Sequence, residues 1–216
     1  MNTGNNFGVG VALWALLGAT VAWAQPSFPI ERPAIKLGDA WTSRTVDGWN
    51  NRETGQFTVT VVGFEAEKVL VRSHALPSDQ TQTQTYTADW QPCRSMQNSS
   101  ELVCGGSLRF PLTADYKHSY QKLPRTNGMT YLDAKCEGKG FEKVKVPAGE
   151  FDAFKIECKG EWTRVFGGSF SGQYEETYWY APDVRHRVKY VFNDRRSNGQ
   201  PDTKLIVELT EFKPAP

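Results

Sequence analysis

The clearest hydrophobic pattern in the chain lies on either side of a short turn. Residues 141–146 and 154–158 alternate apolar with charged side chains, and Pro147, Ala148 and Gly149 lie between them. Successive side chains of a strand point to opposite faces, so each segment has one apolar face. Pro147 presets the backbone angle of the turn and Gly149 relieves it at the end. The pattern predicts an antiparallel hairpin with one buried face.

The sequence pattern is typical of β-strands along most of the rest of the chain from residue 35. The polar alternation at 79–87 indicates an exposed edge strand, and residues 193–202 are expected to form a long polar turn. No segment shows a sustained period of 3.6 residues, so helix is expected to be minor. The predicted fold is an all-β antiparallel meander forming a curved sheet, a half-barrel or a sandwich. The remaining predicted strands are 58–62, 69–73, 162–166, 173–180, 187–192 and 205–212.

A weak similarity between two segments of the sequence indicates the domain organisation. Residues 37–41 and 111–116 each place a turn and then an aromatic residue before a run of strands. We therefore expect two related β modules, 35–107 and 108–216, preceded by a proline-rich extended arm at 25–34. A single continuous sheet is the alternative.

The first 24 residues have the pattern of a signal peptide. A polar start is followed by an apolar run over 7–21, and Ala22 and Ala24 occupy the positions that signal peptidase reads. The start carries no Lys or Arg, which departs from the usual pattern. A buried helix is the alternative, but it would be apolar all round and uncapped. We expect cleavage after Ala24 and a periplasmic or secreted protein with no membrane span. Gln25, rather than a cysteine, follows the cleavage site, so no lipid anchor is expected there.

The charge balance excludes one class of partner. The chain has 25 basic and 24 acidic residues, a net charge of +1. Nucleic-acid binding needs a clustered basic surface, so no nucleic-acid partner is expected. A small apolar or sugar ligand remains compatible with this charge.

Four cysteines favour two disulfides. Cys93 and Cys104 bracket a turn-forming segment, and Cys136 and Cys158 bracket the hairpin described above. We therefore expect the pairs Cys93–Cys104 and Cys136–Cys158. Zinc is the rival interpretation, but no C-x₂-C pair exists and an exported chain meets an oxidising compartment.

No catalytic motif stands out. The segment 168–172 resembles a nucleophile elbow, but Phe170 stands where the serine should be. His74, His118 and His186 lack partners at metal-ligand spacing, and the loop beginning at Asp194 lacks the oxygen ligands of a calcium site. No carboxylate pair of the kind that a glycosidase needs is visible. We expect no catalytic residue, no cofactor and no metal.

The aromatic residues are the main candidates for ligand contact. Along residues 174–180, Tyr174, Glu176, Tyr178 and Tyr180 share one face of the expected strand. Such residues form either an aromatic platform for a sugar, lipid or peptide, or ordinary core packing. The candidate ligand-facing residues are Trp41, Trp162, Tyr178, Trp179 and Tyr180.

Three motifs carry a family resemblance. They are L-G-D-x-W at 37–41, V-x-V-P-A-G-x-F at 144–151 and T-x-W-Y-A-P at 177–182, followed by R-V-K at 187–189. Together they resemble a family of exported proteobacterial proteins with a domain of unknown function. The resemblance covers most of the mature chain and is most specific over 144–190. It implies a β-rich domain near envelope or secretion functions, and it carries over no catalytic residues.

These observations predict a noncatalytic periplasmic β protein. We expect it to bind an apolar or carbohydrate-like ligand, or a partner protein, in the cell envelope. The alternative is a hydrolase acting on envelope glycans or esters.

Overall fold

The computed structural model describes residue 1 and residues 27–96, 99, 101–125, 129–165 and 170–216. The predicted signal peptide and its cleavage site lie outside the described residues, Met1 apart. The strands are β1 (Ala40–Asp47), β2 (Glu53–Glu65), β3 (Lys68–Leu76), β4 (Gln80–Thr87), β5 (Pro92–Ser95), β6 (Leu102–Cys104), β7 (Lys117–Arg125), β8 (Thr130–Val146), β9 (Gly149–Arg164), β10 (Phe170–Ala181), β11 (His186–Arg196) and β12 (Pro201–Lys213).

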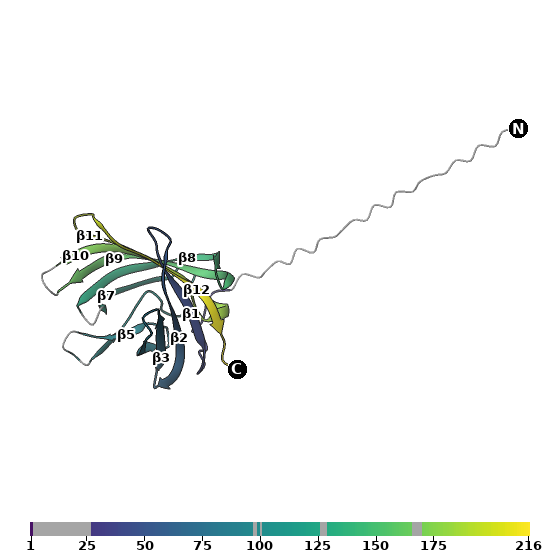
Figure 1. The fold of residues 1–216 in the computed structure, drawn as a ribbon, viewed down its shortest axis with the longest axis horizontal. Coiled ribbons are helices and arrows are strands. Elements are labelled where there is room, and N and C mark those ends of the chain that lie inside the picture. The colour runs from purple at the N-terminus through teal and green to yellow at the C-terminus, as the bar shows by residue number, and fades with distance from the viewer. Residues whose placement is uncertain (2–26, 97–98, 100, 126–128, 166–169) are drawn as a thin grey trace.

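All of these strands belong to one antiparallel sheet. Its 12 strands follow the order β6-β5-β4-β3-β2-β1-β12-β11-β10-β9-β8-β7. The first and last strands, β1 and β12, therefore pair in the middle of the sheet, and the chain meanders outward from them to β6 and β7. The sheet curls until β5 and β6 contact β7, so it is nearly closed and barrel-shaped (Figure 1). The prediction of an all-β curved meander is confirmed.

Helix is minor in the described residues. One 3-10 turn, η1 (Pro182–Val184), links β10 to β11. In the part of the chain that the structure describes, no helix has the length and apolar character needed to cross a membrane.

The two predicted modules contribute to the same sheet. Residues 35–107 supply β1–β6 and residues 108–216 supply β7–β12, with the β1–β12 ladder joining the halves. The described part of the expected arm packs onto the sheet: Ile30 and Leu112 exchange two backbone hydrogen bonds of 2.9 Å, and Phe28 contacts Phe141 and Phe154. The division into two related modules stays a prediction.

The hairpin predicted from the alternating pattern is confirmed. β8 and β9 join through Pro147 and Ala148, and Val146 pairs with Gly149. This register places Cys136 directly opposite Cys158, and the structure contains both expected disulfides, Cys93–Cys104 and Cys136–Cys158. Alternation and turn chemistry predict the hairpin, and a β-bulge between Gly138 and Gly140 shifts the register by one residue to bring Cys136 opposite Cys158.

The long polar turn predicted at 193–202 is wrong. β11 continues to Arg196 and β12 begins at Pro201, so the reversal itself is short and contains Gly199 at a φ of 82°. The polar residues on either side of the reversal belong to the two strands, and Arg196 of β11 forms an ion pair with Asp202 of β12 at 2.9 Å. The polarity reflects their exposure to solvent and not the absence of a strand.

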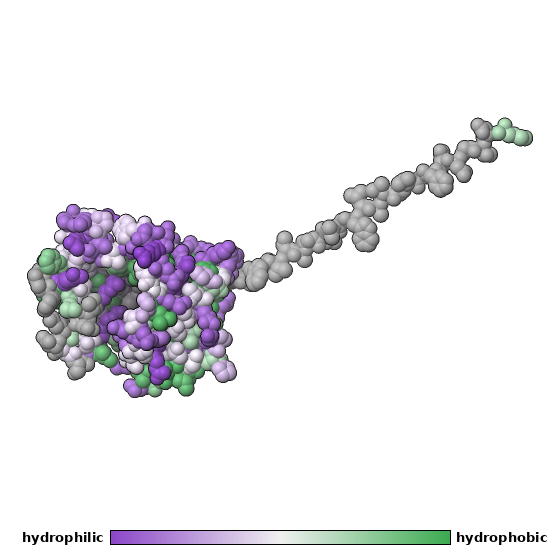
Figure 2. All heavy atoms as spheres, viewed as in Figure 1, coloured by the Kyte–Doolittle hydropathy of each residue, from purple (hydrophilic) through white to green (hydrophobic). Residues whose placement is uncertain are grey.

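The core lies inside the curl. Buried side chains alternate with exposed ones along the strands, as the burial of alternate residues of β10 shows. The outer surface in Figure 2 is largely hydrophilic, with hydrophobic residues scattered over it and at its lower edge. The interior is therefore where the chain can enclose a ligand.

Candidate ligand-binding site

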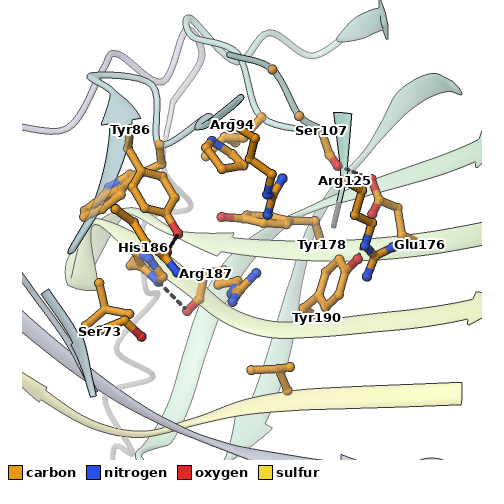
Figure 3. Close-up of a pocket in the computed structure, with 18 of the residues that line it drawn as sticks. Ser73, Tyr86, Arg94, Ser107, Arg125, Glu176, Tyr178, His186, Arg187 and Tyr190 are labelled. Atoms are coloured by element: carbon orange, nitrogen blue, oxygen red, sulfur yellow. Dashed lines mark hydrogen bonds between the residues drawn. The ribbon is translucent and has the colours of Figure 1, made fainter. Parts of the chain in front are cut away.

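A cavity of about 470 Å³ lies inside the curved sheet. Residues from almost every strand line it, including Tyr86, Arg94, Glu176, Tyr178 and Tyr190 (Figure 3). Its volume is in the range of small-molecule sites. The lining mixes apolar, tyrosine and charged side chains.

One side of the cavity is built by β10 and β11. Glu176 and Tyr178 point inward from β10, as the sequence alternation predicts, and Tyr178 pairs with Tyr190 of β11. Burial raises the pKa of Tyr178 to about 12. Burial, followed by the nearby Glu176 carboxylate, raises the pKa of Tyr190 well above its ordinary value. Both phenols therefore stay protonated and can donate hydrogen bonds.

Glu176 is buried and held by hydroxyl groups. Its carboxylate accepts hydrogen bonds from Tyr120 at 3.0 Å, from Tyr190 at 2.8 Å and from Ser107. The Tyr120 and Tyr174 hydroxyls lie 2.9 Å apart, which extends the network. Glu176 is the only carboxylate among the described lining residues, so this part of the lining holds no second carboxylate for a glycosidase pair.

Three arginines also line the cavity, and β-bulges direct two of them inward. Tyr178 and Tyr180 of β10 pair with Tyr190 and Arg187, so a two-residue step on β10 matches a three-residue step on β11. The extra residue reverses the alternation and turns Arg187 to the inner face. Strict alternation from Tyr190 would have pointed Arg187 outward.

A second β-bulge turns Arg125 toward the cavity. Tyr120 and Leu123 of β7 pair with Ala134 and Leu132 of β8, which again inserts one residue. Lys122 takes the positive φ of 49° at this bulge, and its N–H donates to Asp133 at 2.7 Å. Leu123 and Arg125 consequently face the cavity together.

The third arginine, Arg94, projects from β5 beside a disulfide. Cys93 pairs with Cys104 across β5 and β6, and Arg94 follows on the opposite face of the strand. Burial lowers the pKa of Arg94, and Arg125 and Arg187 add to this shift. β5 lies next to the end strand β6, and β7 is the opposite end of the sheet, so the curl brings Arg94 and Arg125 into one cavity.

An aromatic cluster closes the cavity beside η1. His186 stacks on Trp41 with ring centres 4.9 Å apart and meets Trp90 edge-on at 4.8 Å. The indole N–H groups of Trp41 and Trp90 donate to the carbonyls of Val184 and Arg185. Burial, together with the neighbouring Arg187 guanidinium, lowers the pKa of His186 to about 3. His186 is therefore a neutral packing residue at neutral pH.

Replacing His186 with asparagine is expected to flatten the dependence of stability on pH. The unfolded chain takes up a proton at His186 near pH 6.5, whereas the folded protein does so only near pH 3. Acidification between these values therefore favours unfolding, by up to about 1.4 kcal/mol per pH unit. Urea unfolding of both proteins from pH 7 to pH 4 measures this, because the carboxylates common to both cancel in the difference. A stability difference that does not change with pH would contradict it.

The five aromatic residues predicted to contact a ligand lie in different places. Tyr178 lines the cavity, whereas Trp41 and Tyr180 are about 1% exposed and pack in the core. Trp162 lines a smaller neighbouring cavity of about 160 Å³. Trp179 lies on the outer face, because it alternates with Tyr178, and its indole donates to Glu142 at 2.6 Å. Only Tyr178 of the five borders the large cavity.

The family motifs have structural positions. Pro147 and Gly149 form the β8–β9 turn, β10 ends at Ala181, and Pro182 starts η1. Asp39 of the first motif is fully buried and pairs with Arg185. These residues shape the sheet that surrounds the cavity.

Sequence reasoning missed the three arginines, Ser107 and Tyr120. The arginines resembled ordinary surface charges, because no residue near them in the sequence indicates a β-bulge.

Among the described residues, no group of His, Cys, Asp and Glu side chains has the arrangement of a metal site.

Comparison with known proteins supports the fold. No protein-family model matches the sequence, and no curated protein matches it. The structure is similar to that of a protein from Parabacteroides distasonis provisionally named a lipoprotein. The two are 15% identical with a TM-score of 0.52, over 87% of this chain and 100% of the other.

A second solved structure is similar over nearly the same length. It is a Bacteroides fragilis protein provisionally named as exported, with a YmcC-like fold. It is 13% identical with a TM-score of 0.48, over 86% of this chain and 99% of the other. The family resemblance of the three motifs stays a prediction, whereas the overall fold is similar to that of the Parabacteroides protein.

Proposed function

We propose that the mature chain is a noncatalytic binding protein of the bacterial cell envelope that holds a small molecule inside its curved sheet. The observation that carries this proposal is the cavity of about 470 Å³ lined by inward-facing residues of the strands. A protein that used only its outer surface would gain most stability by filling this space with apolar side chains. The lining instead keeps tyrosines and charged groups around an open volume.

Three observations support an envelope location. The first 24 residues have signal-peptide character, and two disulfides suit an oxidising compartment. The similar Parabacteroides distasonis protein carries the name of a lipoprotein. In this proposal the periplasmic chain begins at Gln25, after cleavage behind Ala24.

Native mass spectrometry of protein purified from the bacterial envelope tests this function. We expect a chain beginning at Gln25 with two disulfides and a bound small molecule that is released on denaturation. Ala75 lines the cavity from β3, so Ala75→Trp fills it and is expected to abolish the adduct. Thr83→Trp, on the exposed face of the neighbouring β4, is the matched control and should keep the adduct. A bare monomer in the wild type would contradict the proposal.

A further inference from the structure

The cavity concentrates positive charge that the described protein does not neutralise. Arg94, Arg125 and Arg187 line it together with a single carboxylate, Glu176. Figure 3 shows Arg94 and Arg187 pointing into the space bounded by Tyr86, Tyr178 and Tyr190, with Arg125 beside Glu176. The formal net charge of the lining is +2, because His186 is neutral.

The three guanidinium groups lack acidic partners among the described residues. Some arginines elsewhere form ion pairs, as Arg44 does with Glu208 at 2.7 Å. For the three cavity arginines, by contrast, no carboxylate oxygen of the described chain lies within 4.0 Å. The Nε of Arg187 is buried and has no hydrogen-bond partner among the described residues. Guanidinium groups that line a cavity without an acidic partner are costly to bury, which favours an anionic acceptor supplied by a ligand.

Glu176 does not neutralise the remaining positive charge of the lining. Its oxygens already accept hydrogen bonds from Ser107, Tyr120 and Tyr190. The network fixes Glu176 and leaves the guanidinium groups with their donors available. Arg125 and Arg187 meanwhile pack over aromatic rings, at 4.4 Å from the Phe192 ring centre and 5.2 Å from that of Tyr190. These contacts hold the side chains in place without consuming their N–H donors.

Part of the remaining lining is apolar, while Ser73, Gln82 and Gln84 add neutral polar groups. Phe57 and Val59 of β2 and Leu205 and Val207 of β12 line the cavity without offering polar side-chain groups. A free inorganic anion would leave this part of the volume unfilled. A ligand that contacts both the arginines and the apolar part of the lining needs an anionic head and an apolar body.

We propose that the ligand is an amphiphilic anion, a phosphate or carboxylate carried on an apolar or aromatic body, whose head is bound by Arg94, Arg125 and Arg187. This inference rests on the proposed binding function and adds the chemical class of the ligand. Arginine suits the role because its planar guanidinium presents paired N–H donors that match phosphate and carboxylate oxygens.

Calorimetric titration with a matched set of probes tests the inference. The probes are 2-naphthyl phosphate, 2-naphthoate, neutral 2-naphthol and inorganic phosphate. We expect at least one naphthyl anion to bind about tenfold or more tightly than 2-naphthol, since charged hydrogen bonds exceed neutral ones. The tighter of the two anions identifies the head group. Added salt should weaken the binding of the anions and leave 2-naphthol unaffected.

Arginine variants locate the head group. Arg187→Gln is expected to remove the preference for the anion, bringing its affinity within a few-fold of that for 2-naphthol. Arg72 lies on the exposed face of β3, so Arg72→Gln is the matched control and should keep the wild-type preference. Retention of 2-naphthol binding by Arg187→Gln shows that the variant is folded. A preference unchanged in Arg187→Gln would overturn the assignment.

The outcomes separate this inference from the proposed function. Equal affinity of the wild type for 2-naphthol and the anions would overturn the anionic class and leave a binding function in place. Inorganic phosphate binding as tightly as 2-naphthyl phosphate would overturn the apolar body. Absence of binding by every probe, with an adduct present on the envelope-purified protein, would overturn the ligand class alone. Absence of both would overturn the function as well.

Discussion

Replacing Asp39 with alanine is expected to lower the free energy of unfolding by about 3 to 5 kcal/mol. The Asp39 carboxylate is fully buried and accepts three hydrogen bonds: from the Arg185 guanidinium at 2.8 Å, the Lys36 N–H at 2.8 Å and the Ala215 N–H at 2.9 Å. Through these bonds it joins the segment before β1, the turn after η1 and the chain end after β12. The alanine variant would leave the half-buried Arg185 guanidinium without its acidic partner and two N–H groups without an acceptor.

Urea unfolding followed by tryptophan fluorescence measures this loss. Asp115→Ala is the matched control, because Asp115 is exposed and forms no ion pair with the described residues. We expect the control to change stability by no more than about 0.5 kcal/mol. Asp39→Asn keeps the size and part of the acceptor capacity, so an intermediate loss is expected. A loss below about 1 kcal/mol in Asp39→Ala would show that the three segments are held by other contacts.

The sequence was sufficient for features that depend on neighbouring residues. The β8–β9 hairpin follows from alternation and from Pro147 and Gly149, and it brings Cys136 and Cys158 close together, with a bulge between Gly138 and Gly140 completing their alignment. The inward face of β10 follows from the same alternation. The hairpin and the inward face of β10 needed only the period of a strand and the chemistry of one turn.

The arginine cluster could not be predicted in the same way. Arg125 and Arg187 face inward because each lies beside a β-bulge that shifts the alternation by one residue. A bulge depends on the pairing of two strands, and neither Lys122 nor Val188 marks one by residue type. The meeting of Arg94 with Arg125 depends on how far the whole sheet curls. Only the assembled sheet reveals these relations.

The aromatic candidates illustrate a related limit. Trp179 and Tyr178 are equally suited to ligand contact by composition, yet adjacent strand residues face opposite sides. Tyr178 and Tyr180 share a face, but Tyr180 packs against Phe110 with ring centres 5.1 Å apart, whereas Tyr178 borders open volume. Residue type predicted an aromatic interior, and the spacing of the strands decided which ring a ligand can reach.

Removing the Cys136–Cys158 disulfide by a double alanine substitution is expected to destabilise the protein by about 3 kcal/mol. The bridge joins residues 22 apart in sequence, and its removal restores the conformational freedom of that loop in the unfolded chain. Both cysteines are about 1% exposed, so the variant also loses packing in the core between β8 and β9. Urea unfolding of the oxidised wild type and the variant measures the difference.

The Cys93–Cys104 double alanine variant is the matched comparison and separates stability from binding. Its loop spans 11 residues, half as many, which lowers the expected entropic loss by about 0.6 kcal/mol. These cysteines are half-buried on β5 and β6 near the end of the sheet, so less packing is lost. β5 carries Arg94, however, and freeing it should weaken the binding of 2-naphthyl phosphate, whereas the Cys136–Cys158 variant, while folded, should retain that binding. A larger stability loss from the Cys93–Cys104 variant would contradict this division, because it would place the main covalent support of the fold at the sheet end and not in its core.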